Sequence, residues 1–273
     1  MAEFITDTQT LKKLHKSVTV PGNEAISGST QNFVEDYYFK VTEDGVKIQV
    51  ISTSDDAFAK IDYSDVEVEE EGEVVIPDIN KFSSILSRFG SDEKLRVSDN
   101  GKKLEISSEE TPKKFSTKTQ HYEDLDSYVD TSEDGEFGLV VTLDKDTDED
   151  KWQAEGSNGT MNMDRKVVVD VNQMKEVIGD AQVIEARDLP FEIEDEEFDI
   201  TLGSEYEGIH THIETETVRG EDAKATYQKA LDGIFKEHEG EITFYFNTNC
   251  PLIIETGSGE NLQAVYLIAP KVE

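Results

Sequence analysis

The sequence predicts an α+β protein made of two structurally similar halves. Three observations lead to this prediction: each half carries two amphipathic helical patterns, runs of alternating apolar residues separate them, and the order helix, strands, helix, strands recurs after an acidic middle stretch. Because short turns join the alternating runs, we expect mostly antiparallel sheets with two helices per half. A chain of 273 residues has room for two modest domains of this kind.

The first half begins with a predicted helix over 8–18, capped by Thr8 or Thr10, and contains a second helix over 78–89 that ends at Gly90. Alternating apolar residues and hairpin turns predict the strands of this half. These strands are expected at 33–41, 46–50, 57–63, 65–69, 73–76, 95–97, 103–107 and 114–119.

The second half opens with a predicted strand over 167–171 and carries helices over 172–180 and 222–238. Its other alternating runs predict strands at 190–194, 198–202, 209–215, 241–247, 251–255 and 264–268. The repeated order therefore divides the chain into two domains joined by a long connection. We expect a first domain over 1–119, an extended connecting segment with an insertion over 120–165, and a second domain over 166–273.

The connecting segment contains a further candidate strand at 139–143 and an apolar side chain, Trp152, that is expected to cover other residues. It also places Asp144, Asp146, Asp148 and Glu155 at the first, third, fifth and twelfth positions of a calcium-loop spacing. The position that should be Gly is Glu149, and no convincing helix precedes the loop. Chance in an acidic chain explains this match better than a calcium site.

The charge balance limits how this chain meets nucleic acid. It has 61 Asp and Glu against 26 Lys and Arg, which gives a net charge of −35. Proteins that bind DNA do so by neutralising phosphates and are usually basic. Any contact with DNA must therefore be confined to a local patch of Lys and Arg. The acidic remainder also suits a concentrated-salt cytosol, where self-repulsion is screened, so a halophilic source fits.

Cysteine usage and hydropathy point to the cytoplasm. Cys250 is the single cysteine, so no disulfide forms within the chain. No apolar run approaches the ~18 residues of a membrane span, and the start lacks a signal-peptide pattern. We expect a cytoplasmic or nucleoid-associated protein, or a nuclear one in a eukaryote, without a membrane partner.

The last segment, CPLIIETGSGENLQAVYLIAPKVE, carries the most specific pattern in the chain. It resembles the C-terminus of proliferating cell nuclear antigen (PCNA), the eukaryotic and archaeal sliding clamp, at Pro251, Leu252, Glu255, Tyr266, Ala269, Pro270 and Lys271. Residues 44–63 resemble a hairpin of that clamp, and 76–97 resemble the second helix of its first domain.

This resemblance implies a DNA-clamp fold with two duplicated domains and a DNA polymerase sliding clamp, or processivity factor. Subunits would close into a homotrimeric ring, with helices lining the central hole and antiparallel sheets outside. The ring would encircle double-stranded DNA without base contacts. It would tether DNA polymerase, the clamp loader and other replication and repair proteins through short clamp-binding peptides. The resemblance implies no catalytic residue and no cofactor.

Basic residues on the predicted helices supply the expected DNA-facing surface. In a chain with so few cations, their position on helix faces is what a hole lined by phosphates requires. The set is Lys12, Lys13, Lys16, Lys81, Arg88, Lys175, Lys229 and Lys236. Acidic residues also occur on the predicted helices of the second half, at Glu176, Asp232 and Glu237. The alternative is that these lysines only solvate helix surfaces.

The resemblance also implies that subunits join by pairing two edge strands, here 113–119 of one subunit with 209–216 of the next. The first bears Lys113, Lys114 and Lys118, and the second bears Glu214 and Glu216. Opposite charges on two exposed edges favour this pairing over association of like edges. The alternative is that these charges protect solvated edges from aggregation.

A docking groove for partner peptides is implied in the same way, between the connecting segment and the C-terminal strands. Its apolar residues would accept a short helical peptide with aromatic anchors. The expected lining is Ile51, Ala57, Tyr128, Val129, Pro251, Leu267, Ala269 and Pro270. Asp55 and Asp56 make this region more acidic than in the family, so peptide preference is expected to differ. Ordinary packing is the alternative for several of these residues.

Other chemistry finds little support in the sequence. His210 and His212 alternate on one strand face and would suit a metal ion if a third ligand were nearby, but a plain strand surface is the simpler interpretation. No nucleophile with a base, and no Gly-rich phosphate loop, is recognisable. We therefore predict no enzyme, no metal site and no cofactor. The competing functions are an acidic interaction scaffold or DNA mimic that binds basic proteins, and a metal-dependent enzyme using Asp144 and Asp146.

Overall fold

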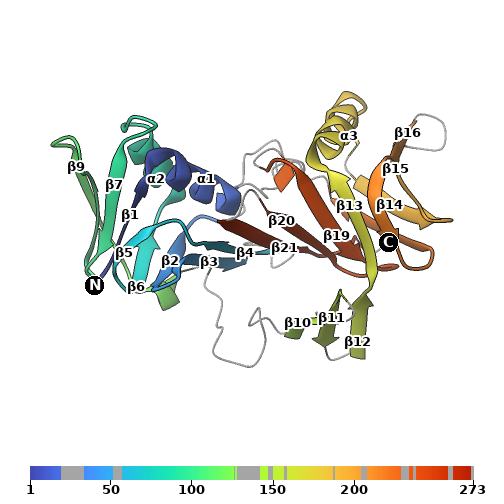
Figure 1. Cartoon of the computed structure of the whole chain (residues 1–273), viewed down its shortest axis with the longest axis horizontal. Helices are drawn as coiled ribbons and strands as arrows, with labels where there is room; N and C mark the ends of the chain where they lie inside the picture. The colour runs from blue at the N-terminus through green and yellow to red at the C-terminus, as the bar shows by residue number, and fades with distance from the viewer. Residues whose placement is uncertain are drawn as a thin grey trace. The chain divides into compact units, whose positions relative to one another are not determined.

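The computed structural model describes residues 1–19, 34–51, 57–125, 127, 142–146, 150–156, 159–186, 188–203, 208–228, 234–235, 238–257 and 261–271. These residues form two compact units, shown in blue to green and in yellow to red (Figure 1). The first unit takes in Met1–Gly22, Gln31–Tyr128 and Gly259–Gln263, and the second takes in the remainder. Among the described helices, none is long and apolar enough to cross a membrane.

The first unit contains a five-stranded antiparallel sheet. Its strand order is β5 (Glu67–Glu70), β1 (Ala2–Asp7), β7 (Lys94–Asp99), β8 (Lys103–Ser108) and β9 (Lys114–Lys118). Strand β1 was not predicted from the sequence, because six residues alternate too briefly to stand out. It lies between β5 and β7, and Phe4 on it is fully buried.

A second run of antiparallel strands completes this unit, and its order is β4 (Ala57–Tyr63), β3 (Gly45–Ile51), β2 (Tyr37–Thr42) and β6 (Gly72–Ile76). The predicted hairpin between β2 and β3 is confirmed. Gly45 has φ of 135°, and a Cβ there would collide with the carbonyl oxygen of Tyr63. Only glycine fits this turn without strain.

Both predicted helices of the first half are confirmed, as α1 (Thr8–Thr19) and α2 (Ile79–Leu86). They lie together along one side of this unit's strands (Figure 1). An aromatic cluster joins them to the core. The rings of Tyr37 and Phe82 are 6.4 Å apart, and Phe39 lies 5.3 Å from both Tyr37 and Phe4. Such edge-to-face pairs add about 0.5–1.5 kcal/mol each beyond the area they bury.

The second unit repeats the plan with two antiparallel runs of strands. One has the order β17 (Thr215–Arg219), β13 (Arg165–Asp170), β19 (Glu241–Phe246), β20 (Leu252–Gly257) and β21 (Leu262–Ile268). The other is a four-stranded sheet in the order β16 (Gly208–Ile213), β15 (Glu197–Gly203), β14 (Asp188–Glu194) and β18 (Ala223–Gln228). Helix α3 (Val171–Val183) packs on them and confirms the helix predicted over 172–180.

Two predictions for the second half are wrong. The segment 223–228 was assigned to a long helix but forms β18, which pairs with β14 along six residues. Ala223, Ala225 and Tyr227 alternate along this segment and are all buried, which is typical of a strand. The segment was assigned to a helix because an amphipathic helical pattern follows it directly in the sequence. Of the rest of that predicted helix, Ile234 and Phe235 are helical, while 229–233 and 236–237 lie outside the described residues.

The strand predicted over 209–215 also divides in two. Strand β16 ends at Ile213, and β17 starts at Thr215 and joins a different sheet. Between them, the side chain of Gln173 on α3 donates from Nε2 to the carbonyl oxygen of Glu214 at 2.8 Å. Its Oε1 accepts from the Glu214 N–H at 2.9 Å. This amide satisfies the peptide groups of Glu214 and thereby stabilises the break.

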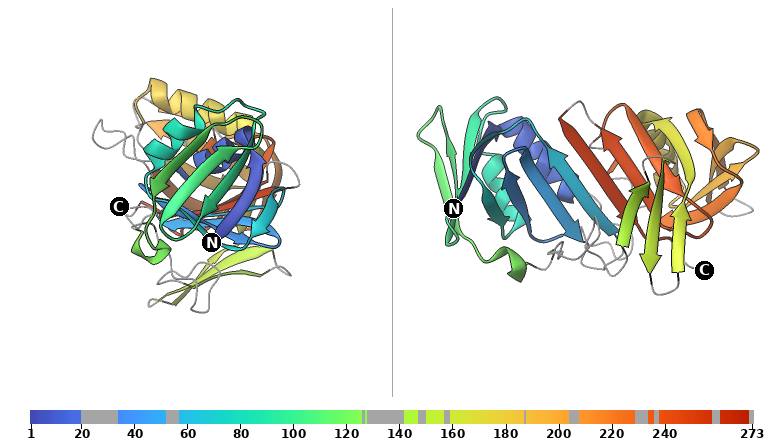
Figure 2. Two further views of the ribbon diagram at one scale, coloured as in Figure 1. Left: turned by 90° about the vertical axis from the view of Figure 1, so that its left-hand side faces the viewer. Right: turned by 60° about the horizontal axis from the view of Figure 1, so that its bottom comes forward.

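The insertion forms a small antiparallel sheet of β10 (Thr142–Asp146), β11 (Lys151–Gly156) and β12 (Gly159–Met163) (Figure 2). Trp152 on β11 is 2% exposed, and its Nε1 donates to Oε1 of Glu255 on β20 at 3.0 Å. Lys145 forms an ion pair with the same carboxylate and lies over the ring of Tyr245, 5.4 Å from its centroid. The insertion is thus docked on β19 and β20 through a mixed aromatic and charged contact.

The candidate strand at 139–143 is represented by β10, which begins at Thr142, and 139–141 lie outside the described residues. Asp144 and Asp146 stand on β10, which pairs antiparallel with β11, so these two residues lie on a sheet rather than in a calcium-binding loop. Asp148 lies outside the described residues.

The start of the connecting segment packs on the first unit. After a short 3₁₀ turn at Tyr122–Asp124, Leu125 is buried against Tyr38 and Val75. The N–H of Ser127 donates to Oδ1 of Asp36 at 3.1 Å.

Candidate nucleic-acid interface

Helix α1 separates apolar and basic residues on opposite sides. Leu11, Leu14 and Val18 are buried with exposures of 0 to 1%. Lys12, Lys13 and Lys16, spaced three and four residues apart across the other side, are half-buried or exposed. The predicted cap was wrong: Asp7, not Thr8 or Thr10, supplies the oxygen, which accepts from the Thr10 N–H at 2.8 Å.

Of the next two basic residues predicted to face DNA, Lys81 lies on helix α2, whereas Arg88 lies in the turn after it, because the helix ends at Leu86 rather than at 89 as predicted. Asp78 caps it by accepting from the Lys81 N–H at 2.8 Å, while Ile79, Phe82 and Leu86 point into the core. Lys81 and Arg88 are exposed. The ammonium of Lys81 donates to Oγ1 of Thr117 on β9 at 2.7 Å, which holds this lysine on the β9 side of the helix.

His15 fixes α1 against α2. Its Nε2 lies 2.8 Å from the hydroxyl of Ser83 on α2, and its Nδ1 lies 3.1 Å from the hydroxyl of Tyr37 on β2. Burial lowers the pKa of His15 to about 4, so the ring is neutral at pH 7. The two helices are therefore joined by an uncharged contact.

The composition of these helices is the feature that the sequence reasoning missed. Neither the 12 residues of α1 nor the 8 of α2 include an Asp or Glu, in a chain where more than one residue in five is acidic. Beside Lys81, α2 exposes Asn80, Ser83 and Ser84, and the exposed acidic residue at its start is the cap Asp78. A scan for segments without acidic residues would have found both helices. They form a locally positive surface on a strongly negative chain.

The second unit does not repeat this pattern on α3. That helix contains Glu176 and Asp180 beside its one lysine, Lys175. The ammonium of Lys175 is half-buried and donates to the carbonyl oxygen of His238 at 3.0 Å, so part of its hydrogen-bonding capacity is used within the protein. Lys229 and Lys236, also predicted to face DNA, lie outside the described residues.

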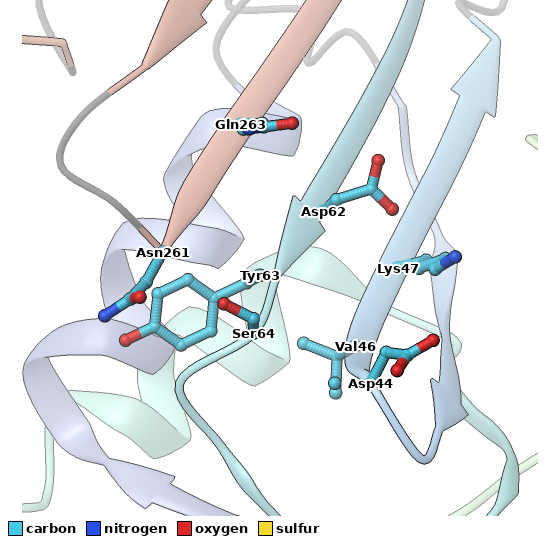
Figure 3. A pocket seen from close by; sticks show the side chains of 9 residues that line it. Asp44, Val46, Lys47, Asp62, Tyr63, Ser64, Asn261 and Gln263 are labelled. Atoms are coloured by element: carbon cyan, nitrogen blue, oxygen red, sulfur yellow. The ribbon is translucent and has the colours of Figure 1, made fainter.

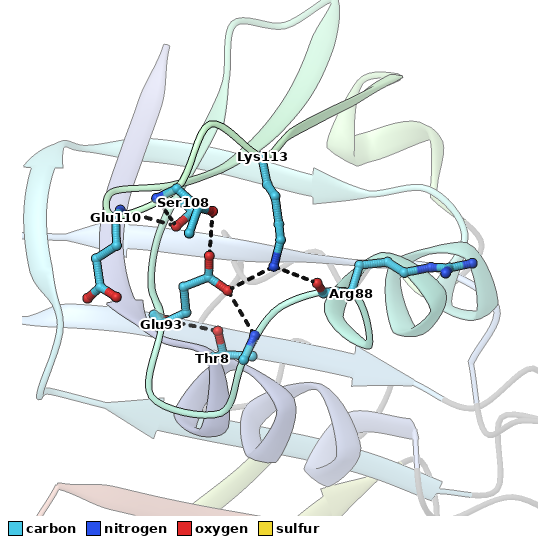
Figure 4. Close-up of polar contacts among 8 residues, drawn as sticks. Thr8, Arg88, Glu93, Ser108, Glu110 and Lys113 are labelled. Atoms are coloured by element: carbon cyan, nitrogen blue, oxygen red, sulfur yellow. Dashed lines mark hydrogen bonds and ion pairs between the residues drawn. The ribbon is translucent and has the colours of Figure 1, made fainter.

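The three lysines expected at a subunit interface differ in their surroundings, and Figure 4 shows those of Lys113. The ammonium of Lys113 donates to the carbonyl oxygen of Arg88 at 3.0 Å and lies 3.4 Å from Oε2 of Glu93. Lys114 forms an ion pair with Glu105 at 2.9 Å, and Lys118 is exposed near the end of β9. Strand β9 is the last strand on its side of the sheet.

Their predicted acidic counterparts do not share one strand. Strand β16 is an edge of its sheet, but Glu214 lies in the break after it, and Glu216 lies on β17. The break at Glu214, described above, is the reason. The edge position of both β9 and β16 leaves a row of backbone groups without a neighbouring strand within the described residues, which is the requirement for pairing with another chain.

The residues expected at the peptide groove are divided between the units. Ile51 and Ala57 belong to the first unit. Pro251, Leu267, Ala269 and Pro270 belong to the second. Tyr128 and Val129 lie outside the described residues. The groove therefore stays a prediction.

A polar pocket of about 290 Å³ lies in the first unit, at the turn between β2 and β3 (Figure 3). Its lining includes Asp44, Lys47, Asp62, Tyr63 and Asn261, with neither His nor Cys among the lining residues. Ser64 also lines it, so the pocket combines carboxylate, ammonium and hydroxyl groups.

The duplicated order of helices and antiparallel strands, with α1 and α2 on one side of the first unit, defines a DNA sliding-clamp fold. Solved structures of PCNA share it over essentially the whole chain, so this protein is PCNA-like in fold. A. fulgidus PCNA, solved with the C-terminal region of FEN-1, aligns with a TM-score of 0.71 and 16% identity, covering 100% of this chain and 99% of that one.

Two further clamps match nearly as well. PCNA from Thermococcus kodakaraensis aligns with a TM-score of 0.68 and 16% identity, and the PCNA2–PCNA3 complex from Sulfolobus tokodaii with 0.68 and 15%. Each alignment covers 99% of this chain and 100% of the other. No family model and no curated protein sequence matches the chain. The likeness is therefore one of structure, retained at low sequence identity.

Proposed function

We propose that this protein is a subunit of a DNA polymerase sliding clamp, a processivity factor that surrounds duplex DNA as a homotrimeric ring. The observation that carries this proposal is the pair of helices without acidic residues, α1 and α2, whose outer sides hold Lys12, Lys13, Lys16 and Lys81, with Arg88 exposed just after α2. In the proposed ring, these helices would line the central hole and face the phosphates of DNA.

Electrostatics explains why the contact is limited to these helices. A net charge of −35 repels a polyanion from most of the surface, so DNA is attracted only where cations gather without acidic neighbours. Lysines reach phosphates through flexible stems and read no bases. The resulting attraction is weak and independent of DNA sequence. The closed ring, rather than affinity, would keep the protein on DNA while it slides.

The partners follow from the same proposal. A. fulgidus PCNA is solved with a peptide from FEN-1, and the Sulfolobus clamp is solved as a complex of two PCNA chains. By analogy, this chain would bind short peptides of DNA polymerase, the clamp loader and other replication proteins, and would assemble with copies of itself. It would act without catalysis, in the cytoplasm or on the nucleoid.

Mass and topology test the proposal together. Light scattering after size-exclusion chromatography should give three times the mass of one chain. The protein should be retained on a nicked circular plasmid and released when a restriction enzyme linearises that plasmid, because a ring slides off an open end. A stable monomer, or equal retention on the circular and linear forms, contradicts the proposal. A monomer that binds basic proteins would support an acidic scaffold instead.

A further inference from the structure

Four metal-ligating side chains gather on one face of the sheet β16-β15-β14-β18. Strands β15 and β16 pair antiparallel with Asp199 opposite His212 and Thr201 opposite His210. Since side chains alternate along a strand, Ile200 and Ile213 point into the core at 0 and 1% exposure, and the histidines point outward. Glu197 lies two residues before Asp199 on the same face.

The distances place one carboxylate between both imidazole rings. Oδ1 of Asp199 lies 3.1 Å from Nδ1 of His212 and 3.6 Å from Nε2 of His210. Glu197, Asp199 and His212 each offer a ligand atom, and these atoms lie within 4.8 Å of one another. Among the described residues, this is the one cluster of three or more such groups within that distance. The sequence had shown the histidine pair but not its third ligand.

The neighbour of His210 orients its ring toward the carboxylate. Nδ1 of His210 lies 3.0 Å from the hydroxyl of Thr201. When Nδ1 of His210 carries the proton and donates it to Thr201, Nε2 of His210 is unprotonated. Its lone pair then faces Oδ1 of Asp199, so two hydrogen-bond acceptors lie opposite each other and repel. A cation between them removes this repulsion. A hydrogen bond on the far nitrogen of a ligand histidine is also the usual way in which its ring is oriented for a metal.

We propose that Glu197, Asp199 and His212 form a binding site for one Zn²⁺ ion, with His210 brought in as the fourth ligand. Two imidazoles with one or two carboxylates suit zinc, whereas Mg²⁺ and Ca²⁺ prefer oxygen ligands alone. Tetrahedral zinc with bonds of about 2.0–2.1 Å places its ligand atoms about 3.4 Å apart. The distance of 3.1 Å between Oδ1 of Asp199 and Nδ1 of His212 is close to this value, and rotation of the exposed side chains of Glu197 and His210 would complete the site.

A bound ion is expected to cross-link strands β15 and β16 at the edge of the sheet. Among the described strands, β16 pairs with β15 and with no other. A metal ion bound by residues of both strands would join them through their side chains as well as their backbones. Because a ligand that binds only the folded state stabilises it, zinc should raise the resistance of this unit to unfolding. This inference does not depend on ring formation or on DNA binding.

Zinc affinity of the full chain tests the site. Isothermal titration with ZnCl₂, in a buffer containing a weak competing chelator, should give one ion per wild-type chain. The double variant His210→Asn/His212→Asn should bind zinc at least about tenfold more weakly. His121→Asn is the matched control, since His121 is an exposed histidine 3.5 Å from Glu123, and its affinity should equal that of wild type. Excess Mg²⁺ should not compete.

A second measurement separates loss of the site from loss of the fold. Without metal, the double variant and the wild type should unfold at the same temperature, because both histidines are exposed. Zinc should raise the midpoint of the wild type and of His121→Asn but not that of the double variant. Unchanged zinc affinity in the double variant, an absence of stoichiometric binding by wild type, or an equal zinc shift in all three proteins would overturn the proposal.

Discussion

The backbone carbonyl oxygen of Glu93 accepts two hydrogen bonds from Thr8, one from its N–H at 3.0 Å and one from its hydroxyl at 2.8 Å (Figure 4). The carboxylate of Glu93 accepts from the N–H of Gly90 at 2.8 Å and from the hydroxyl of Thr111 at 2.6 Å. Glu93 therefore forms hydrogen bonds with the start of α1, with the turn after α2 and with the turn before β9. The positions of both basic helices depend on it.

The Glu93 carboxylate should make stability depend on acid pH. Hydrogen bonds from Thr111, Ser108 and Gly90 lower its pKa from 4.5 to about 2. A depressed carboxyl pKa stabilises the folded state above pH 4.5, and this contribution is lost as pH falls toward 2. The variant Glu93→Gln should lose less of its thermal midpoint than wild type between pH 5 and pH 3. Glu110→Gln, at an exposed site nearby, should follow wild type, and parallel curves for all three would contradict the prediction.

His15 should impose a second pH dependence at higher pH. Burial lowers the pKa of His15 from 6.5 to about 4. Between these two pH values the unfolded chain binds a proton at this residue and the folded chain does not. Stability is unaffected above pH 6.5, falls as pH drops from 6.5 to 4, and loses roughly 3 kcal/mol in total. Urea denaturation from pH 7 to pH 4 should show a smaller loss in His15→Gln. The variant at the exposed His121, His121→Gln, serves as control, and its pH profile should match wild type.

Reversing the charge of two of the basic residues on α1, which are Lys12, Lys13 and Lys16, should weaken the attraction to DNA. In Lys12→Glu/Lys16→Glu, the residence time on a nicked plasmid should shorten, and the slope of log affinity against log salt should fall by about two, since each phosphate contact contributes about 0.9. The control Lys40→Glu/Lys47→Glu makes the same change in net charge at exposed positions on β2 and β3. Equal effects from both variants would show that overall charge, rather than the position of these lysines on α1, is responsible.

The edge lysines should control assembly. Lys114→Glu/Lys118→Glu reverses the charge of β9, and Glu214, which directly follows the proposed partner edge β16, would then meet like charge, so the trimer should dissociate to monomers. Lys113 is left unchanged because its ammonium contacts Arg88 and Glu93 within the chain. Light scattering measures the mass directly. A variant that still elutes as a trimer refutes the assignment of β9 as a joining edge.

Trp152 should report on docking of the insertion, because it is the single tryptophan of the chain and is buried. Replacing its acceptor in Glu255→Ala leaves the indole N–H without that partner and removes the ion pair with Lys145, at a cost of about 1–3 kcal/mol. Acrylamide should then quench the fluorescence more strongly. Glu241→Ala, at an exposed site on β19, should leave quenching unchanged. Equal quenching in all proteins would mean that the Glu255 contact does not hold the insertion.

Local patterns predicted the regular elements well where they were long. Apolar spacing predicts the helices α1, α2 and α3 and most strands. When one side of an element is buried, apolar residues recur at a fixed spacing among residues that are close in the sequence. Short or composite segments failed. Strand β1 is too brief, β18 merges in sequence with an amphipathic pattern, and the strand after Gly208 is broken by Gln173, a residue 41 positions from Glu214. No local pattern reports such a distant side chain.

Composition and periodicity alone determined that this chain is strongly acidic, has an α+β plan repeated twice, and carries several of its lysines on predicted helices. Only the tertiary structure decided which of those lysines share a surface, and it also brought Asp199 beside His212 and Glu255 beside Trp152, a pair 103 residues apart. The physical reason is that periodicity specifies which side of an element is buried but not which element covers it. Strand pairing and side-chain packing make that choice across the whole chain.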